Sequence, residues 1–96
     1  MENNNNTEIE SLETAQNALG DYIEGIEQDI ATMQKAVKDC LDNMGSDEYS
    51  KKAAEILEKS LNDLNDIVQR AMEIKEEIHQ EIIVIIENRE AIEILE

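Results

Sequence analysis

A short motif in the second half of the chain holds the residues best suited to metal chemistry. Glu76 and His79 are three residues apart, so on a helix both side chains share one face and could ligate one metal ion. In di-iron carboxylate bundles two such motifs combine with a glutamate from each of two further helices, and Glu13 is the best-placed candidate here. However, the apolar line of this helix runs through Lys75 and Ile78, beside His79. We therefore predict a solvated or rim His79 and no metal or cofactor.

The remaining residues offer no other catalytic grouping. The chain has one histidine, one cysteine and no glycine-rich phosphate-binding loop. Cys40 has no second cysteine with which to form a disulfide, and it falls on an apolar helix line, as expected of a small buried hydrophobic residue. We therefore expect that the protein is not an enzyme.

The composition is that of long helices with a strongly acidic surface. The 96 residues include no proline, and 24 acidic side chains against eight basic ones give a net charge of −16. Such a surface repels phosphate backbones and anionic lipids, because binding either requires clustered lysine or arginine. We therefore exclude nucleic-acid binding. We also expect no membrane insertion, since the longest apolar run, 82–86, is far too short to span a bilayer.

The first residues have neither the basic region nor the apolar region of a secretory signal peptide. We expect a protein that is made in the cytoplasm. The alternative is that it leaves the cell with its partner by a leaderless pathway.

Apolar residues recur at alternating spacings of three and four, a pattern that predicts two long helices. The asparagine-rich residues 1–7 are expected to form a disordered leader before a single helical hairpin over 8–96. The first helix is predicted over about 8–44, the turn at 45–46 and the second helix over about 47–90.

Three residues are assigned to the turn. Asn43 precedes it, Gly45 suits the left-handed residue that closes the first helix, and Ser46 suits the cap that opens the second. A turn this short makes the two helices antiparallel neighbours. The sequence therefore predicts an all-α fold, an antiparallel two-helix hairpin.

The second helix has more apolar surface than the first helix can cover. A single hairpin has one seam and little core, so we expect it to complete a four-helix bundle with another helical protein or with a second copy of itself. If the turn is centred near residue 46, the second helix overhangs the first beyond about residue 84. We interpret this overhang as a docking segment, with a frayed C-terminus as the alternative. The predicted partner-binding residues are Ile67, Ile74, Ile82, Ile83, Ile85, Ile86, Ile92 and Leu95.

The turn and the helix pattern resemble those of the WXG family, which are small, acidic, leaderless helical hairpins exported by type VII secretion systems. Gly45 matches the glycine of the family's Trp-x-Gly turn, Asn43 replaces the tryptophan, and the segment from Ser46 to Tyr49 is similar to the one that follows. No tyrosine after the second helix supplies the Tyr-x-x-x-Asp/Glu export signal. The chain thus looks most like the hairpin helper proteins that accompany LXG toxins.

This resemblance implies a chaperone and targeting factor. Such a protein would bind the helical N-terminal domain of an LXG toxin, or a sister hairpin, and assist export of the toxin. Two alternatives remain open on the residues alone: a homodimeric, ferritin-like metal-binding bundle, and a generic helical adaptor with no role in secretion.

Overall fold

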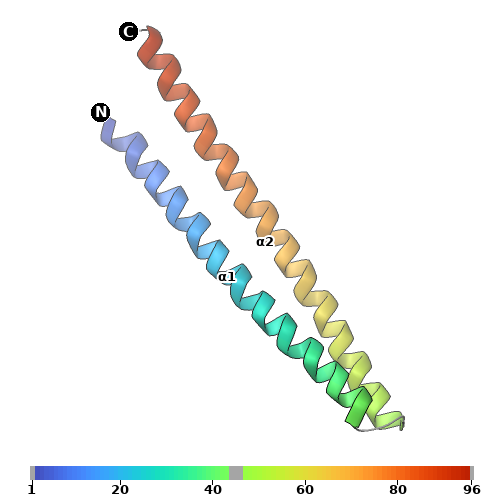
Figure 1. Ribbon diagram of the computed structural model, residues 1–96. Coiled ribbons are helices and arrows are strands. Elements are labelled where there is room, and N and C mark those ends of the chain that lie inside the picture. Colours follow the sequence, from blue (N-terminus) through green and yellow to red (C-terminus); the bar gives the residue numbers. More distant parts are fainter. Residues whose placement is uncertain (1, 44–46, 96) are drawn as a thin grey trace. The chain divides into compact units, whose positions relative to one another are not determined.

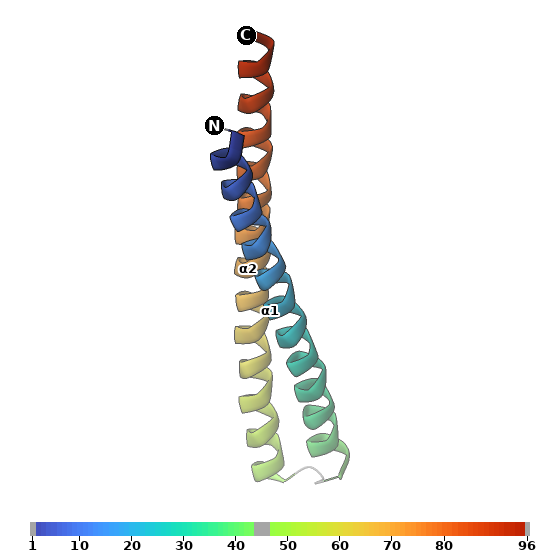
Figure 2. The same cartoon turned by 90° about the vertical axis from the view of Figure 1, so that its left-hand side faces the viewer.

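The computed structural model describes the backbone of residues 2–43 and 47–95 and the side chains of residues 7–42 and 47–93. These residues form two helices and no strand, α1 (Glu2–Asn43) and α2 (Glu48–Leu95) (Figure 1). The chain reverses direction between them, so that segments of α1 and α2 run antiparallel (Figures 1 and 2). The predicted all-α helical hairpin is confirmed.

Both helices extend further than predicted. α1 begins at Glu2 and so includes residues 2–7, which were expected to form a disordered leader, and α2 continues to Leu95 rather than to about residue 90. Extending an existing helix adds one backbone hydrogen bond for each residue fixed. Asparagine lowers helix stability by at most about 0.7 kcal/mol per residue relative to alanine. A local capping signal therefore does not determine where a long helix begins.

The chain divides into two compact units, and each contains part of both helices. Unit 1 consists of Met1–Tyr22 and Ala71–Glu96, and unit 2 consists of Ile23–Arg70. In each unit a segment of α1 packs against a segment of α2.

Each unit has a core only one layer deep. Among the described side chains, the buried apolar residues are Ile23, Ile26 and Ala54 in unit 2, and Ala71 and Ile82 in unit 1. All five belong to the apolar seam that the alternating spacing predicts. Most other seam residues are half-buried, because only one other helix covers each of them and the rest of the side chain faces solvent.

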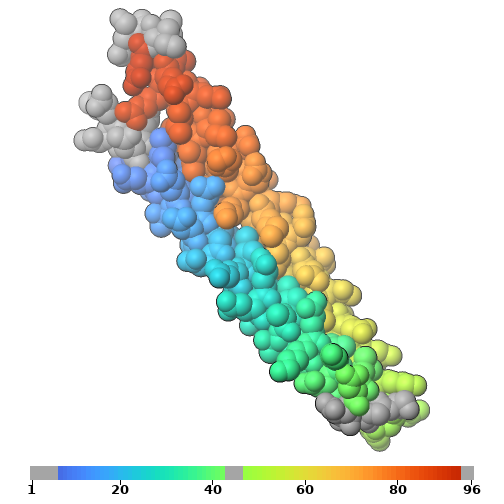
Figure 3. All heavy atoms as spheres, in the orientation of Figure 1, coloured from blue at the N-terminus to red at the C-terminus, as the bar shows by residue number. Residues whose placement is uncertain are grey.

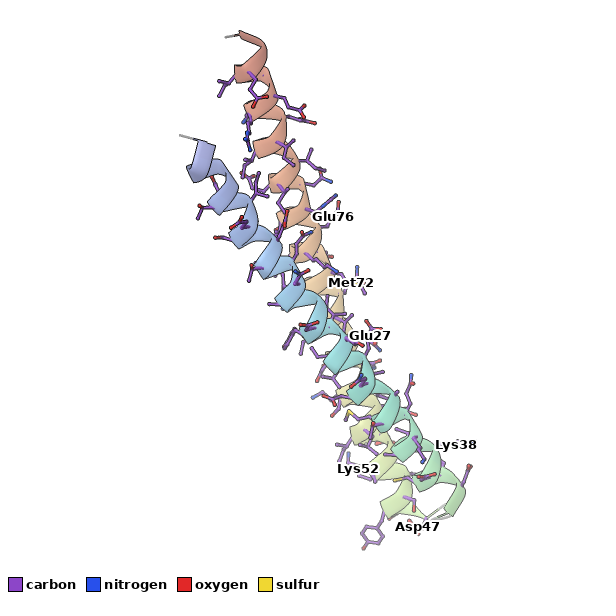
Figure 4. All side chains as sticks on the ribbon, turned by 60° about the vertical axis from the view of Figure 1, so that its left-hand side comes forward. Glu27, Lys38, Asp47, Lys52, Met72 and Glu76 are labelled. Atoms are coloured by element: carbon purple, nitrogen blue, oxygen red, sulfur yellow. The ribbon has the colours of Figure 1, made fainter. Side chains whose placement is uncertain are left out.

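Asp47 is the N-terminal cap of α2 (Figure 4). The backbone N–H of Ser50 donates a 2.7 Å hydrogen bond to Asp47 Oδ1, and the Ser50 side chain also bonds to this carboxylate. These bonds favour the charged form and hold the pKa of Asp47 below its ordinary value. The cap was predicted one residue too early, at Ser46. Gly45 and Ser46 lie outside the described residues, and Asn43 is the last residue of α1.

Candidate functional site

The exposed apolar side chains are concentrated on α2. Within the described part of the chain, α1 exposes two large apolar residues, Tyr22 and Leu41. α2 exposes eight, which are Tyr49, Ile56, Ile67, Met72, Ile74, Val84, Ile86 and Ile92. The apolar stripe of α1 lies mostly in the seam, whereas α2 also carries apolar residues on faces that α1 does not cover. Figure 3 shows side chains of α2 at the molecular surface, next to those of α1.

The first row of exposed apolar residues lies on the part of α2 in unit 2. Tyr49, Ile56 and Ile67 are separated by seven and eleven residues, close to two and three turns of an α-helix. The three side chains therefore share one face, and they are 85%, 57% and 40% exposed. We call them the first half-stripe.

A second row lies on the part of α2 in unit 1. Ile74, Ile85 and Ile92 are separated by eleven and seven residues, so they too share one face. Ile74 is 48% exposed, Ile85 is half-buried and Ile92 is 56% exposed. We call them the second half-stripe.

The predicted partner-binding residues differ in how accessible they are. Ile82 is only 7% exposed and packs in the core of unit 1, so its assignment to a partner surface is corrected: the seam passes through this residue. The side chain of Leu95 lies outside the described residues. Of the others, the exposed residues are Ile67, Ile74, Ile86 and Ile92, and the half-buried residues are Ile83 and Ile85.

The prediction of partner-binding residues omitted part of the exposed apolar surface. Tyr49 and Ile56 are more exposed than Ile67, but neither was among the predicted partner-binding residues. The seven-residue spacing between them, repeated between Ile85 and Ile92, is the signal that could have found them. A search limited to the seam misses Tyr49 and Ile56, because it follows the face toward α1.

The overhang is shorter than predicted. A Cβ atom placed on Gly20 would lie 3.5 Å from Lys75 Nζ, so these two residues are neighbours across unit 1. Counting outward from this pair, residues 2–7 of α1 lie beside roughly residues 88–93 of α2. Ile85 and Ile86 therefore lie beside α1 rather than beyond it. Only the last part of α2 extends past the start of α1 (Figures 1 and 2).

The metal-site candidates are separate surface groups. Glu76, His79 and Glu13 are all exposed, and Glu76 Oε1 accepts a 2.8 Å hydrogen bond from Gln80 Nε2. No group of three or more His, Cys, Asp and Glu within the described residues is arranged to hold a metal ion. The structure thus does not bring the three candidates together as one ligand set.

The charges are distributed unevenly between the two units. Unit 1 contains 13 acidic and two basic residues, whereas unit 2 contains 11 acidic and six basic residues. Lys52 pairs with Glu55 at 3.9 Å and Arg89 with Glu93 at 3.6 Å, and both pairs lie within α2 at its surface. Exposed pairs of this kind contribute little to stability. The acidic excess therefore remains to be balanced by solvent ions or by another molecule.

Basic residues accompany the first half-stripe. Ile56 lies in a shallow, open depression on α2 whose lining also includes Lys52 and Lys59. Lys52 is labelled in Figure 4. The second half-stripe instead has Glu77 and Glu81 between Ile74 and Ile85. The lining of the depression also includes Glu55 and Asp63, so the first half-stripe has charged neighbours of both signs.

No protein-family model, curated protein or solved structure matches this chain. Over the described residues, neither helix has a stretch long and apolar enough to cross a membrane. The fold and the surface define a class of protein: a helical hairpin whose second helix presents an uncovered apolar face.

Proposed function

We propose that this protein functions by binding another helical protein through the exposed apolar face of α2. The observation that carries the proposal is that α2 holds eight of the ten exposed large apolar residues of the described chain, five of which belong to the two half-stripes. Full burial of such a side chain contributes roughly 1.5–3 kcal/mol, so several of them together could hold a partner helix firmly. Apolar surface gathered in this way typically marks an interaction site.

In its most specific form, the proposal is a WXG-like chaperone and targeting factor for a type VII secretion substrate, with an LXG toxin as the substrate. The hairpin in a chain of about a hundred residues, its acidic character and the match of Gly45 to the glycine of the family's Trp-x-Gly motif support this form. The mechanism is burial of helix against helix. The face of α2 would complete a four-helix bundle with helices of the substrate and cover their apolar surface before export.

The first experiment identifies the partner by copurification of the tagged chain with proteins encoded beside it, including any LXG toxin. The second compares two double variants for binding to that partner. Ile74→Asp with Ile92→Asp alters the second half-stripe, while Asn62→Asp with Gln69→Asp adds the same charge on a polar face of α2.

The half-stripe variant should bind at least about a hundredfold more weakly, because two apolar contacts are lost and two charges are desolvated. The polar-face variant should bind as the unmodified chain does. Circular dichroism should show the same helix content for both, because neither variant changes a buried residue. Equal partner affinity for the two variants would refute α2 as the binding site, and a purified partner without helices would refute the proposed mechanism.

A further inference from the structure

The two half-stripes have the same spacing when they are read in opposite directions. From the N-terminal side, the first half-stripe has spacings of seven and then eleven residues. The second half-stripe, read backward from Ile92 through Ile85 to Ile74, also has spacings of seven and then eleven. Two antiparallel helices that present these rows to each other therefore match Tyr49 with Ile92, Ile56 with Ile85, and Ile67 with Ile74. A parallel alignment of the first half-stripe with the second matches only part of each row, and a parallel alignment in register instead pairs each residue with its own counterpart.

We propose that a second copy of this chain covers the half-stripes in an antiparallel homodimer. The first half-stripe of each copy packs against the second half-stripe of the other. A twofold-symmetric interface requires that if residue i contacts residue j, then j contacts i, and the reversed spacing meets this requirement for all three pairs. Ile56 lies in unit 2 and Ile85 in unit 1, 29 residues further along α2, so this pair forms only between copies.

The distribution of charge between the two units favours the same alignment. With Ile56 opposite Ile85, Lys59 comes opposite position 82 and therefore beside Glu81 of the second copy, while Asp63 comes opposite position 78 and beside Glu77. Lys59 and Glu81 are both exposed in the single chain. The alignment also places unit 1, with 13 acidic and two basic residues, against unit 2, which holds six of the eight basic residues. Pairing unit 1 with unit 1 would instead bring the most acidic surfaces together.

The dimer is distinct from the proposed complex with a secretion partner. It requires only a second copy and would cover the face of α2 while no partner is bound. A helical partner that uses this face would then compete with dimerisation. Failure of partner binding would not affect the dimer, and failure of dimerisation would leave the partner proposal standing.

The main test is a charge-reversal cycle, measured on the full chain by sedimentation equilibrium across the micromolar range. Lys59→Glu and Glu81→Lys should each weaken dimerisation by about tenfold, because an attraction present twice in the dimer becomes a repulsion. The double variant restores opposite charges at both contacts and has the net charge of the original chain, so its affinity should return.

Glu81→Lys makes this test specific. It reduces the net negative charge, so general repulsion between copies would predict tighter dimerisation. Weaker dimerisation, recovered in the double variant, supports the specific antiparallel contact. A chain that remains monomeric throughout, a Glu81→Lys variant that dimerises more tightly, or a double variant that does not recover would each overturn the proposal.

A second pair of variants tests the apolar contact. Ile67→Asp places a charge opposite Ile74 of the other copy, whereas Met72→Asp adds the same charge at a residue of similar exposure outside the half-stripes. Ile67→Asp should weaken dimerisation by at least a hundredfold, and Met72→Asp should change it by less than about threefold. Circular dichroism at the same concentrations reports whether each variant remains helical. Equal effects of the two substitutions on dimerisation would contradict the alignment.

Discussion

Shortening Ile82 and Ile74 to valine makes the same chemical change at two positions on α2 with different surroundings. Ile82 is 7% exposed in the core of unit 1, whereas Ile74 is 48% exposed in the second half-stripe. Removing one methylene from a packed core lowers the free energy of unfolding by about 0.5–1.5 kcal/mol. At Ile74, which is already about half exposed to solvent, the same substitution should change the free energy of unfolding by no more than about 0.5 kcal/mol.

These values predict separable thermal unfolding curves. For a domain of this size, 1 kcal/mol corresponds to a shift in melting temperature of about 4–8 °C. Ile82→Val should therefore melt clearly below the original chain, and Ile74→Val should melt close to it. The measurement is far-ultraviolet circular dichroism in dilute solution, where association is suppressed, repeated at high concentration.

Concentration separates folding from association in this experiment. Equal destabilisation by both variants in dilute solution would refute the reasoning, because it would mean that the isolated chain already buries Ile74 as deeply as Ile82. If Ile74→Val lowers the melting temperature only at high concentration, then association buries this residue. Ile82→Val should lower the melting temperature at both concentrations.

Two further predictions concern single positions on the helices. Asp47→Ala should lower the melting temperature more than Asp47→Asn, because asparagine retains the oxygen that accepts the Ser50 N–H bond. The pKa of Asp47 is lowered by folding, so its charge stabilises the fold above the ordinary pKa, and the difference from Asp47→Asn should vanish as pH falls through the lowered value. Gly25→Ala and Gly20→Ala should each raise the free energy of unfolding by about 0.5–1 kcal/mol, since a Cβ atom meets nothing within 4 Å at Gly25 and an ordinary 3.5 Å contact with Lys75 Nζ at Gly20. Denaturant titration measures the free energy of unfolding of the two glycine variants. A loss of stability in Gly20→Ala alone would show that Lys75 cannot move aside.

The seam was predictable from the sequence because it depends on spacing alone. Ile23, Ile26 and Ala71 recur at threes and fours along their helices, and the structure buries all three. The start of α1 was not predictable from the Thr7 capping signature, because a long helix continues through residues of low helix propensity. That error propagated to the overhang, whose predicted length depended on where α1 begins.

The candidate site was only partly predictable, because α2 has apolar residues on several faces. Ile74 and Ile82 are the same residue type on the same helix, yet one is exposed and the other is buried. Spacing assigns each residue to a face of the helix, and the packing of α1 decides which face is covered. The cap at Asp47 was missed by one residue because Ser46 and Asp47 both have side chains suited to that position.

The distribution of apolar residues links the stability of this hairpin to what covers α2. Among the described side chains, five apolar residues are buried in the core, while α2 alone exposes eight large apolar residues. Lys75 and Arg89 further reduce the apolar contacts of the unit 1 seam. Any molecule that binds only the folded chain adds to its stability, by about 2.7 kcal/mol when present at a hundred times its Kd. A second copy or a helical partner on α2 would therefore stabilise the same helix that binds it.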